Sequence, residues 1–146
     1  MSTKETQELI AANMKRWQKI ENSAIISTAC VIGDVENPIV RLTMEIIQRD
    51  SQMHYRVQQL IAHSLEAGVT SLNIDELEKV WDQIEKHIEI EKDTVSMAKE
   101  SLAAIEGKKG MVIQKYLLEY LLTDEQKHDA MLANLEGIKK GMYPYG

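Results

Sequence analysis

Residues 33–38, with the sequence GDVENP, form the first of three short breaks in a chain that otherwise carries few helix-breaking residues. Asn37 is of a type that caps helix N-termini, and Pro38 suits the first position of the helix that follows. Gly68–Asn73 and Gly107–Gly110 form the other two breaks. The segments between the breaks must be long, so we predict helices over about 4–32, 38–67, 74–106 and 111–136.

Apolar residues recur within these segments at helical spacing, as at Ile20, Ala24, Ile25 and Val31. Short connections between long amphipathic helices make neighbouring helices antiparallel. We therefore predict an all-α fold, an antiparallel four-helix bundle in which residues 1–146 form a single domain. From about residue 138, the sequence IKKGMYPYG predicts a short flexible tail.

Composition and charge exclude several classes of function. The chain has 17 Lys and Arg against 23 Asp and Glu, a net charge of −6, which argues against a nucleic-acid-binding surface. Cys30 is the single cysteine, which excludes an internal disulfide and a four-cysteine metal site. The first residues are polar and no apolar run is long enough to span a membrane, so we expect a cytoplasmic protein without membrane or nucleic-acid partners.

The two halves of the chain repeat each other. Glu45–His54 and Glu119–His128 both read E-x4-D-x-Q-x-H, at an offset of 74 residues. Trp17–Ile26 similarly parallels His87–Ser96 at an offset of 70 residues. A repeat of about 70 residues is too long for a solenoid unit and corresponds to one helical hairpin.

The helical periodicity of about 100° per residue identifies polar residues that share a face. His54 lies about 40° from Asp50, and His128 lies about 40° from Asp124. Glu125 lies about 60° from His128 on the other side, so Asp124 and Glu125 both remain possible neighbours of that imidazole. On the third predicted helix, His87 and Glu91 are four residues apart and share a face, and Glu21 takes the place of Glu91 in the first repeat.

Carboxylates and neutral imidazoles together suit iron or manganese, and neither metal needs a thiolate. A divalent cation would also offset the cost of burying unpaired carboxylates. The alternative is a polar layer held by hydrogen bonds without metal, in which the histidines pair with aspartates of their own helix. The candidate metal ligands are Glu21, Asp50, His54, His87, Glu91, Glu125 and His128.

Over nearly its whole length the chain resembles the ferritin-like carboxylate-bridged di-iron proteins, particularly the rubrerythrin-like branch. In that family two helices each supply a glutamate and two supply Glu-x-x-His. Glu21 and Glu91 match the single glutamates, and Glu125–His128 matches the paired motif. The resemblance implies a di-iron or di-manganese redox protein that reduces peroxide or dioxygen or oxidises ferrous iron. A homodimer is also expected.

The sequence departs from that family in two places. Ser51 stands where the second Glu-x-x-His motif has a bridging glutamate, and Asp50 is the nearest substitute. One cysteine cannot form a rubredoxin module, so a redox protein of this kind needs a separate electron donor. The alternative function is a structural or interaction bundle with a degenerate or single-metal site and no turnover, and no catalytic residue is assigned.

Overall fold

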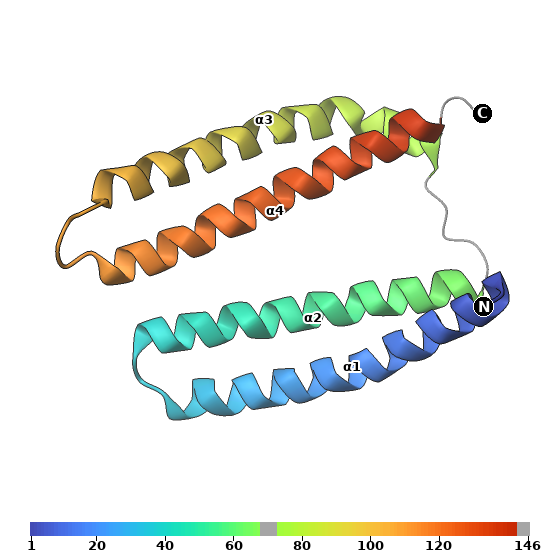
Figure 1. Ribbon diagram of the computed structural model, residues 1–146, viewed down its shortest axis with the longest axis horizontal. Coiled ribbons are helices and arrows are strands. Elements are labelled where there is room, and N and C mark those ends of the chain that lie inside the picture. Colours follow the sequence, from blue (N-terminus) through green and yellow to red (C-terminus); the bar gives the residue numbers. More distant parts are fainter. Residues whose placement is uncertain (68–72, 143–146) are drawn as a thin grey trace. The chain divides into compact units, whose positions relative to one another are not determined.

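The computed structural model describes residues 1–67 and 73–142, which form four helices: α1 (Thr3–Asp34), α2 (Pro38–Glu66), α3 (Ile74–Ile105) and α4 (Val112–Met142) (Figure 1). α1 packs along α2 and α3 packs along α4, each pair as an antiparallel hairpin. Neither described range contains a strand. The predicted all-α class of packed antiparallel helices is confirmed.

Local capping explains where three of the helices begin. The Ser2 side chain accepts from the Glu5 amide, and the Glu5 side chain accepts from the Ser2 amide, which forms a capping box. Asn37 Oδ1 accepts from the first amides of α2 at 2.9 and 3.2 Å, immediately before Pro38. Asn73 caps α3 in the same way. The predicted start of the second helix at Pro38 is therefore correct for the expected reason.

The predicted breaks have different outcomes. The break at residues 33–38 lies between α1 and α2, as expected. The break at Gly107–Gly110 lies between α3 and α4, where Gly107 and Gly110 adopt φ values of 70° and 79° that favour glycine. The break at Gly68–Asn73 lies outside the described residues except for Asn73, and so do residues 143–146 of the predicted tail.

The predicted end of the fourth helix is wrong. α4 continues through Gly137 to Met142, whereas we expected the helix to end near 136 and a flexible tail to begin near 138. A glycine inside a helix costs about 1 kcal/mol, which contacts of its neighbours can offset. Lys140 pairs with Glu136 one turn earlier at 2.8 Å.

A second contact fastens this end of α4 to α3. The ammonium group of Lys139 lies over the indole ring of Trp81, 4.7 Å from its centroid. Trp81 is buried, so the partner of the cation is held in place by the hairpin itself. The contact joins residues far apart in sequence and explains why local composition misplaces the end of the helix.

The contacts of the chain divide into two compact units, Met1–Ser71 and Leu72–Gly146. Each unit is one helical hairpin, as the internal repeat predicts. The burial pattern of α1 recurs in α3 at an offset of 70 residues: Ala11, Glu21 and Thr28 are buried, and so are their counterparts Trp81, Glu91 and Ala98. The single domain spanning residues 1–146 stays a prediction.

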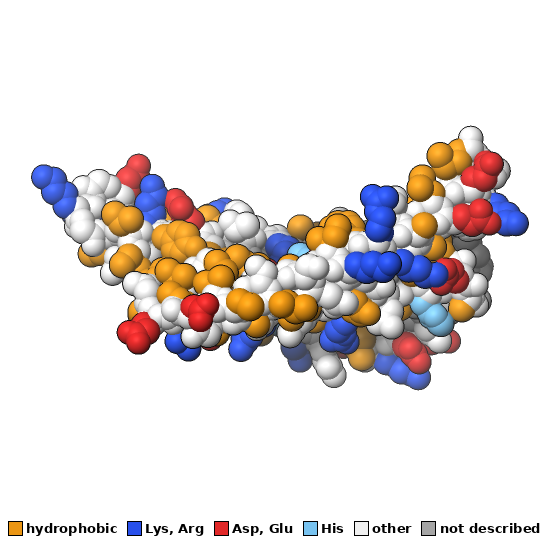
Figure 2. All heavy atoms as spheres, turned by 90° about the horizontal axis from the view of Figure 1, so that it is seen from below, with side chains coloured by type: hydrophobic (Ala, Val, Ile, Leu, Met, Phe, Trp, Pro, Cys, Tyr) orange, Lys and Arg blue, Asp and Glu red, His pale blue; other side chains and the backbone are white. Residues whose placement is uncertain are grey.

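Apolar side chains remain exposed on both hairpins (Figure 2). Ile20 on α1 is 62% exposed, and its repeat counterpart Ile90 on α3 is 56% exposed. The α1/α2 hairpin buries carboxyl, hydroxyl and amide side chains, and the α3/α4 hairpin buries the carboxyl group of Glu91. The inner seam of each hairpin therefore holds polar groups that packing alone does not require. The expected homodimer stays a prediction.

Candidate metal centre

The seam between α3 and α4 brings two carboxylates and an imidazole together. Glu91 lies in the middle of α3, while Glu125 and His128 lie one turn apart on α4. Each of the three offers one ligand atom, and these atoms all lie within 4.8 Å of one another. His128 Nδ1 is 3.6 Å from Glu91 Oε1 and 3.6 Å from Glu125 Oε2. No other such group of three occurs in the described parts of the chain.

Glu91 is the most buried of the three, with 5% of its surface exposed. His87, one turn earlier on α3, places Nε2 2.8 Å from Glu91 Oε1. Within the described residues, the other carboxylate oxygen, Oε2, is buried and has no hydrogen-bond donor. A buried carboxylate oxygen without a partner is costly, so this atom calls for a proton or a cation.

Glu125 faces Glu91 from the neighbouring helix. The pKa of Glu125 is lowered, chiefly by a hydrogen bond with the Glu91 carboxyl and then by the Thr94 hydroxyl, which donates to Oε2 at 3.1 Å. The nearby His128 also lowers this pKa, whereas burial raises it. Two carboxyl groups can share a hydrogen bond only while one of them holds a proton. A metal ion that bound both carboxylates would take the place of that proton.

Asp124 occupies a different side of the imidazole. His128 Nε2 lies 3.4 Å from Asp124 Oδ2, while Nδ1 faces the two glutamates. A carboxylate on the far nitrogen is the arrangement that orients metal-binding histidines in proteins. The sequence left Asp124 and Glu125 both as possible neighbours of His128. The structure places Glu125 on the side of the cluster and Asp124 behind the ring.

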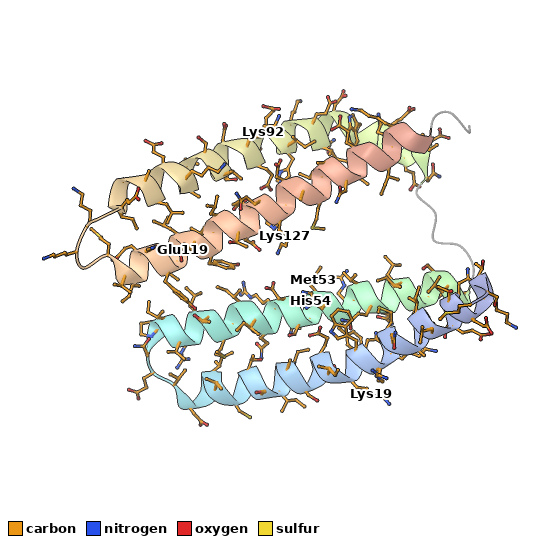
Figure 3. The ribbon with its side chains drawn as sticks, in the orientation of Figure 1. Lys19, Met53, His54, Lys92, Glu119 and Lys127 are labelled. Carbon is orange, nitrogen blue, oxygen red and sulfur yellow. The ribbon has the colours of Figure 1, made fainter. Side chains whose placement is uncertain are left out.

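The α1/α2 hairpin holds a smaller polar cluster around Glu21, which is 5% exposed. His54, midway along α2 (Figure 3), places Nδ1 3.3 Å from Glu21 Oε1. The amide of Gln58, one turn further along α2, donates to the same oxygen at 3.2 Å. Glu21 and His54 are thus brought together as the sequence suggested.

Sequence reasoning missed Gln58 and left Asp50 as a possible partner of His54. No hydrogen bond or ion pair joins Asp50 to His54 in the described part of the α1/α2 hairpin, because the imidazole turns towards Glu21 on α1 instead. Gln58 could have been found from its spacing, since it lies four residues after His54 and therefore on the same helical face.

The donor set of the α3/α4 cluster is chemically specific. It combines carboxylate oxygens with an imidazole nitrogen and contains no sulfur, which suits iron, manganese or zinc better than soft metals such as Cu(I). Three protein ligands leave coordination positions for water or a substrate. The residues present therefore fit a divalent metal ion with coordination positions at which water or a substrate can exchange.

The chain matches no protein-family model, no curated protein and no solved structure. None of the helices that the structure describes is both long and apolar enough to cross a membrane. The chemistry of the chain must therefore be argued from the two polar clusters themselves.

Proposed function

We propose that this chain binds a divalent transition-metal ion, iron or manganese, through Glu91, Glu125 and His128. The observation that carries the proposal is Glu91 Oε2, a buried carboxylate oxygen without a donor in the described residues. It belongs to a group of three ligand atoms within 4.8 Å of one another. A bound cation satisfies this oxygen and balances the charge of the two neighbouring carboxylates.

His87 is a further ligand candidate of this proposal. Its Nε2 already contacts the Glu91 carboxylate at 2.8 Å, and its side chain is more than half exposed. In this proposal His87 either binds the metal itself or orients Glu91 by hydrogen bonding. Asp124 lies on α4 together with His128 and orients that imidazole in the same way.

The proposed use of the metal is redox chemistry with peroxide or dioxygen, or the oxidation of ferrous iron. The resemblance of Glu21, Glu91 and Glu125–His128 to the rubrerythrin-like pattern supports it, and so does a ligand set that leaves positions open. Reduction of one peroxide to two waters consumes two electrons and two protons. A separate donor must supply the electrons, because the single cysteine of this chain cannot hold a rubredoxin-type iron.

The second candidate function is a structural or interaction protein without turnover. The α1/α2 hairpin favours it, because Glu21 there accepts a hydrogen bond from Gln58 and contacts His54. If the α3/α4 cluster is likewise a proton-sharing polar layer, the protein binds no metal tightly. Metal binding therefore separates the two candidates.

The test is the metal content of the protein after anaerobic loading with Fe(II) or Mn(II) and removal of unbound metal. Wild type is expected to retain metal, and Glu91→Gln is expected to lose it, because the amide cannot replace the carboxylate charge. Glu89→Gln is the matched control: Glu89 lies on the same helix, is exposed and pairs with Lys92. Folded wild type without bound metal would contradict the proposal and favour the structural function.

Redox use is tested next on the loaded protein. Peroxide consumption with a chemical electron donor should exceed that of Glu91→Gln treated identically. Metal retention without a difference in peroxide or dioxygen consumption would restrict the function to metal binding.

A further inference from the structure

The internal repeat allows the two hairpins to be compared position by position. At offsets of 70 and 74 residues, Glu21 corresponds to Glu91 and His54 corresponds to His128. Both hairpins place the glutamate in the buried seam and the histidine against it, at 3.3 Å in α1/α2 and 3.6 Å in α3/α4. Because both hairpins share this glutamate–histidine contact, the other residues that differ between the two clusters indicate how their metal affinities should differ.

The first difference is one negative charge. Ser51 on α2 corresponds to Glu125 on α4, and Ser51 is buried with 5% of its surface exposed. The α3/α4 cluster thus has two carboxylates beside its imidazole, and the α1/α2 cluster has one. A divalent cation would therefore have two carboxylates to balance its charge in the α3/α4 hairpin but only one in the α1/α2 hairpin.

The second difference is a hydrogen-bond donor. Gln58, only 3% exposed, donates to Glu21 Oε1, whereas the corresponding residue on α4 is Leu132, which has no polar side-chain atom. α4 supplies no such amide to Glu91, whose Oε1 is contacted by His87 and whose Oε2 lacks a donor in the described chain. Gln58 supplies to Glu21 part of what a cation supplies to Glu91.

The oxygen of the same amide, Gln58 Oε1, remains available as a ligand atom. Gln58 Oε1 is buried and has no hydrogen-bond partner among the described residues. It is a neutral oxygen on the same amide that donates to the Glu21 carboxylate, so it can contribute to a cation site, though without charge. The α1/α2 hairpin therefore retains some capacity to bind a cation.

We propose that the two hairpins are unequal metal sites, and that Ser51 and Gln58 are the residues that set the difference. The first ion binds at Glu91, Glu125 and His128. A second ion binds at Glu21, His54 and Gln58 at least about tenfold more weakly, because this cluster has one carboxylate where the α3/α4 cluster has two, and its amide ligand carries no charge. The inference rests on the proposed metal-binding function and assigns the order in which the ions bind.

The order of binding is tested by titrating the metal-free protein with Mn(II) and measuring free Mn(II) by its electron paramagnetic resonance signal. Wild type is expected to bind one ion tightly, followed by a second step with a Kd at least about tenfold higher. Glu91→Gln should abolish the tight step. Glu21→Gln, its counterpart in the repeat, should abolish the weak step, because Glu21 is the carboxylate ligand of that site.

A gain-of-function variant tests the two residues directly. Ser51→Glu combined with Gln58→Leu copies the α4 residues into α2 and should strengthen the second step at least about tenfold. Far-ultraviolet circular dichroism establishes that the variant folds. Gln58→Leu alone, which keeps the charge unchanged, is the second variant and should weaken the second step, because it removes the amide ligand.

The outcomes separate this inference from the function on which it rests. Wild type that binds no Mn(II) overturns the proposed function. Two ions bound with equal Kd, or equal losses of affinity in Glu21→Gln and Glu91→Gln, overturn the unequal sites and leave the metal-binding function standing. A folded Ser51→Glu, Gln58→Leu variant with an unchanged second step overturns the roles of these two residues.

Discussion

His128 Nδ1 on α4 lies 3.6 Å from Glu91 Oε1 on α3, so the imidazole and the buried carboxylate meet across the seam of one hairpin. The contact joins the two helices at a point where a pair of apolar side chains would be buried at a lower cost in free energy. The arrangement is therefore expected to cost stability without metal and to return it with metal, and this can be measured.

Glu91→Gln should stabilise the metal-free protein by about 1 kcal/mol, because it removes a buried charge whose Oε2 has no donor in the described residues. Urea unfolding in EDTA at pH 8 measures this difference. With Mn(II) at a hundredfold excess over Kd, wild type should gain about 2.7 kcal/mol and overtake the variant. If the variant is less stable than wild type in EDTA, the prediction is wrong, and contacts within the hairpin already offset the cost of burying the Glu91 carboxylate.

Glu125 should make stability depend on pH in the acid range. Its pKa in the folded protein lies below the ordinary value of 4.5, chiefly because of the hydrogen bond with Glu91. The unfolded chain therefore takes up a proton first, so the contribution of Glu125 is complete above about pH 5 and is lost as the pH falls through the folded pKa. In EDTA, the stability difference between wild type and Glu125→Gln should shrink as the pH falls below 4.5.

The exposed Glu119 provides the control for this pH profile. It lies on the same helix and pairs with Lys115 at 3.7 Å, so Glu119→Gln changes the same charge away from the cluster. Its profile should differ from wild type much less than that of Glu125→Gln. Indistinguishable profiles for the two variants would mean that the shared hydrogen bond does not form in solution.

Asp124→Asn should weaken Mn(II) binding by about tenfold, because the carboxylate behind His128 Nε2 holds the ring with Nδ1 towards the glutamates. Asp124 also pairs with Lys127 at 2.6 Å, and Lys127 lies on the same helix (Figure 3). Lys127→Gln removes that ion pair but keeps Asp124, and it should leave the Kd unchanged within about twofold. If both variants change the Kd for Mn(II) equally, Asp124 acts only through the charge of the surface and does not orient His128.

How far the sequence predicts the molecule depends on the range of the interactions involved. The starts of the helices are predictable because caps such as Asn37 bond to amides two and three residues away. The end of α4 is not, because Lys139 finds its partner Trp81 on another helix. Contacts of this kind leave no local signature in composition.

The candidate site shows the same division between local and non-local information. Helical angles placed Asp124 and Glu125 on opposite sides of His128, but both lay within reach, and only the position of α3 separates their roles. His54 could pair along its own helix or across the hairpin, and the structure has it contact Glu21 on α1. The spacing of residues gives the members of a cluster, and tertiary packing decides which of them meet.

Lys139→Ala should loosen the end of α4. Loss of the cation over the Trp81 ring is expected to cost about 0.5–1 kcal/mol at an exposed position. Amide hydrogen exchange of residues 136–142 should become faster while the middle of α4 is unchanged. Lys140→Ala breaks only the ion pair with Glu136 and should have the smaller effect, about 0.3–0.5 kcal/mol.

The burial of Trp81 also gives the chain a natural optical reporter. The protein has two tryptophans, one in each hairpin: Trp17 on α1 is half exposed, and Trp81 on α3 is 8% exposed. Indole emission shifts to longer wavelength in water, so the two rings should emit at different wavelengths in the folded state. Denaturation followed at the shorter wavelength reports the α3/α4 hairpin, and quenching of the longer-wavelength emission reports α1/α2. Each half of the repeat can thus be followed separately without introducing a label.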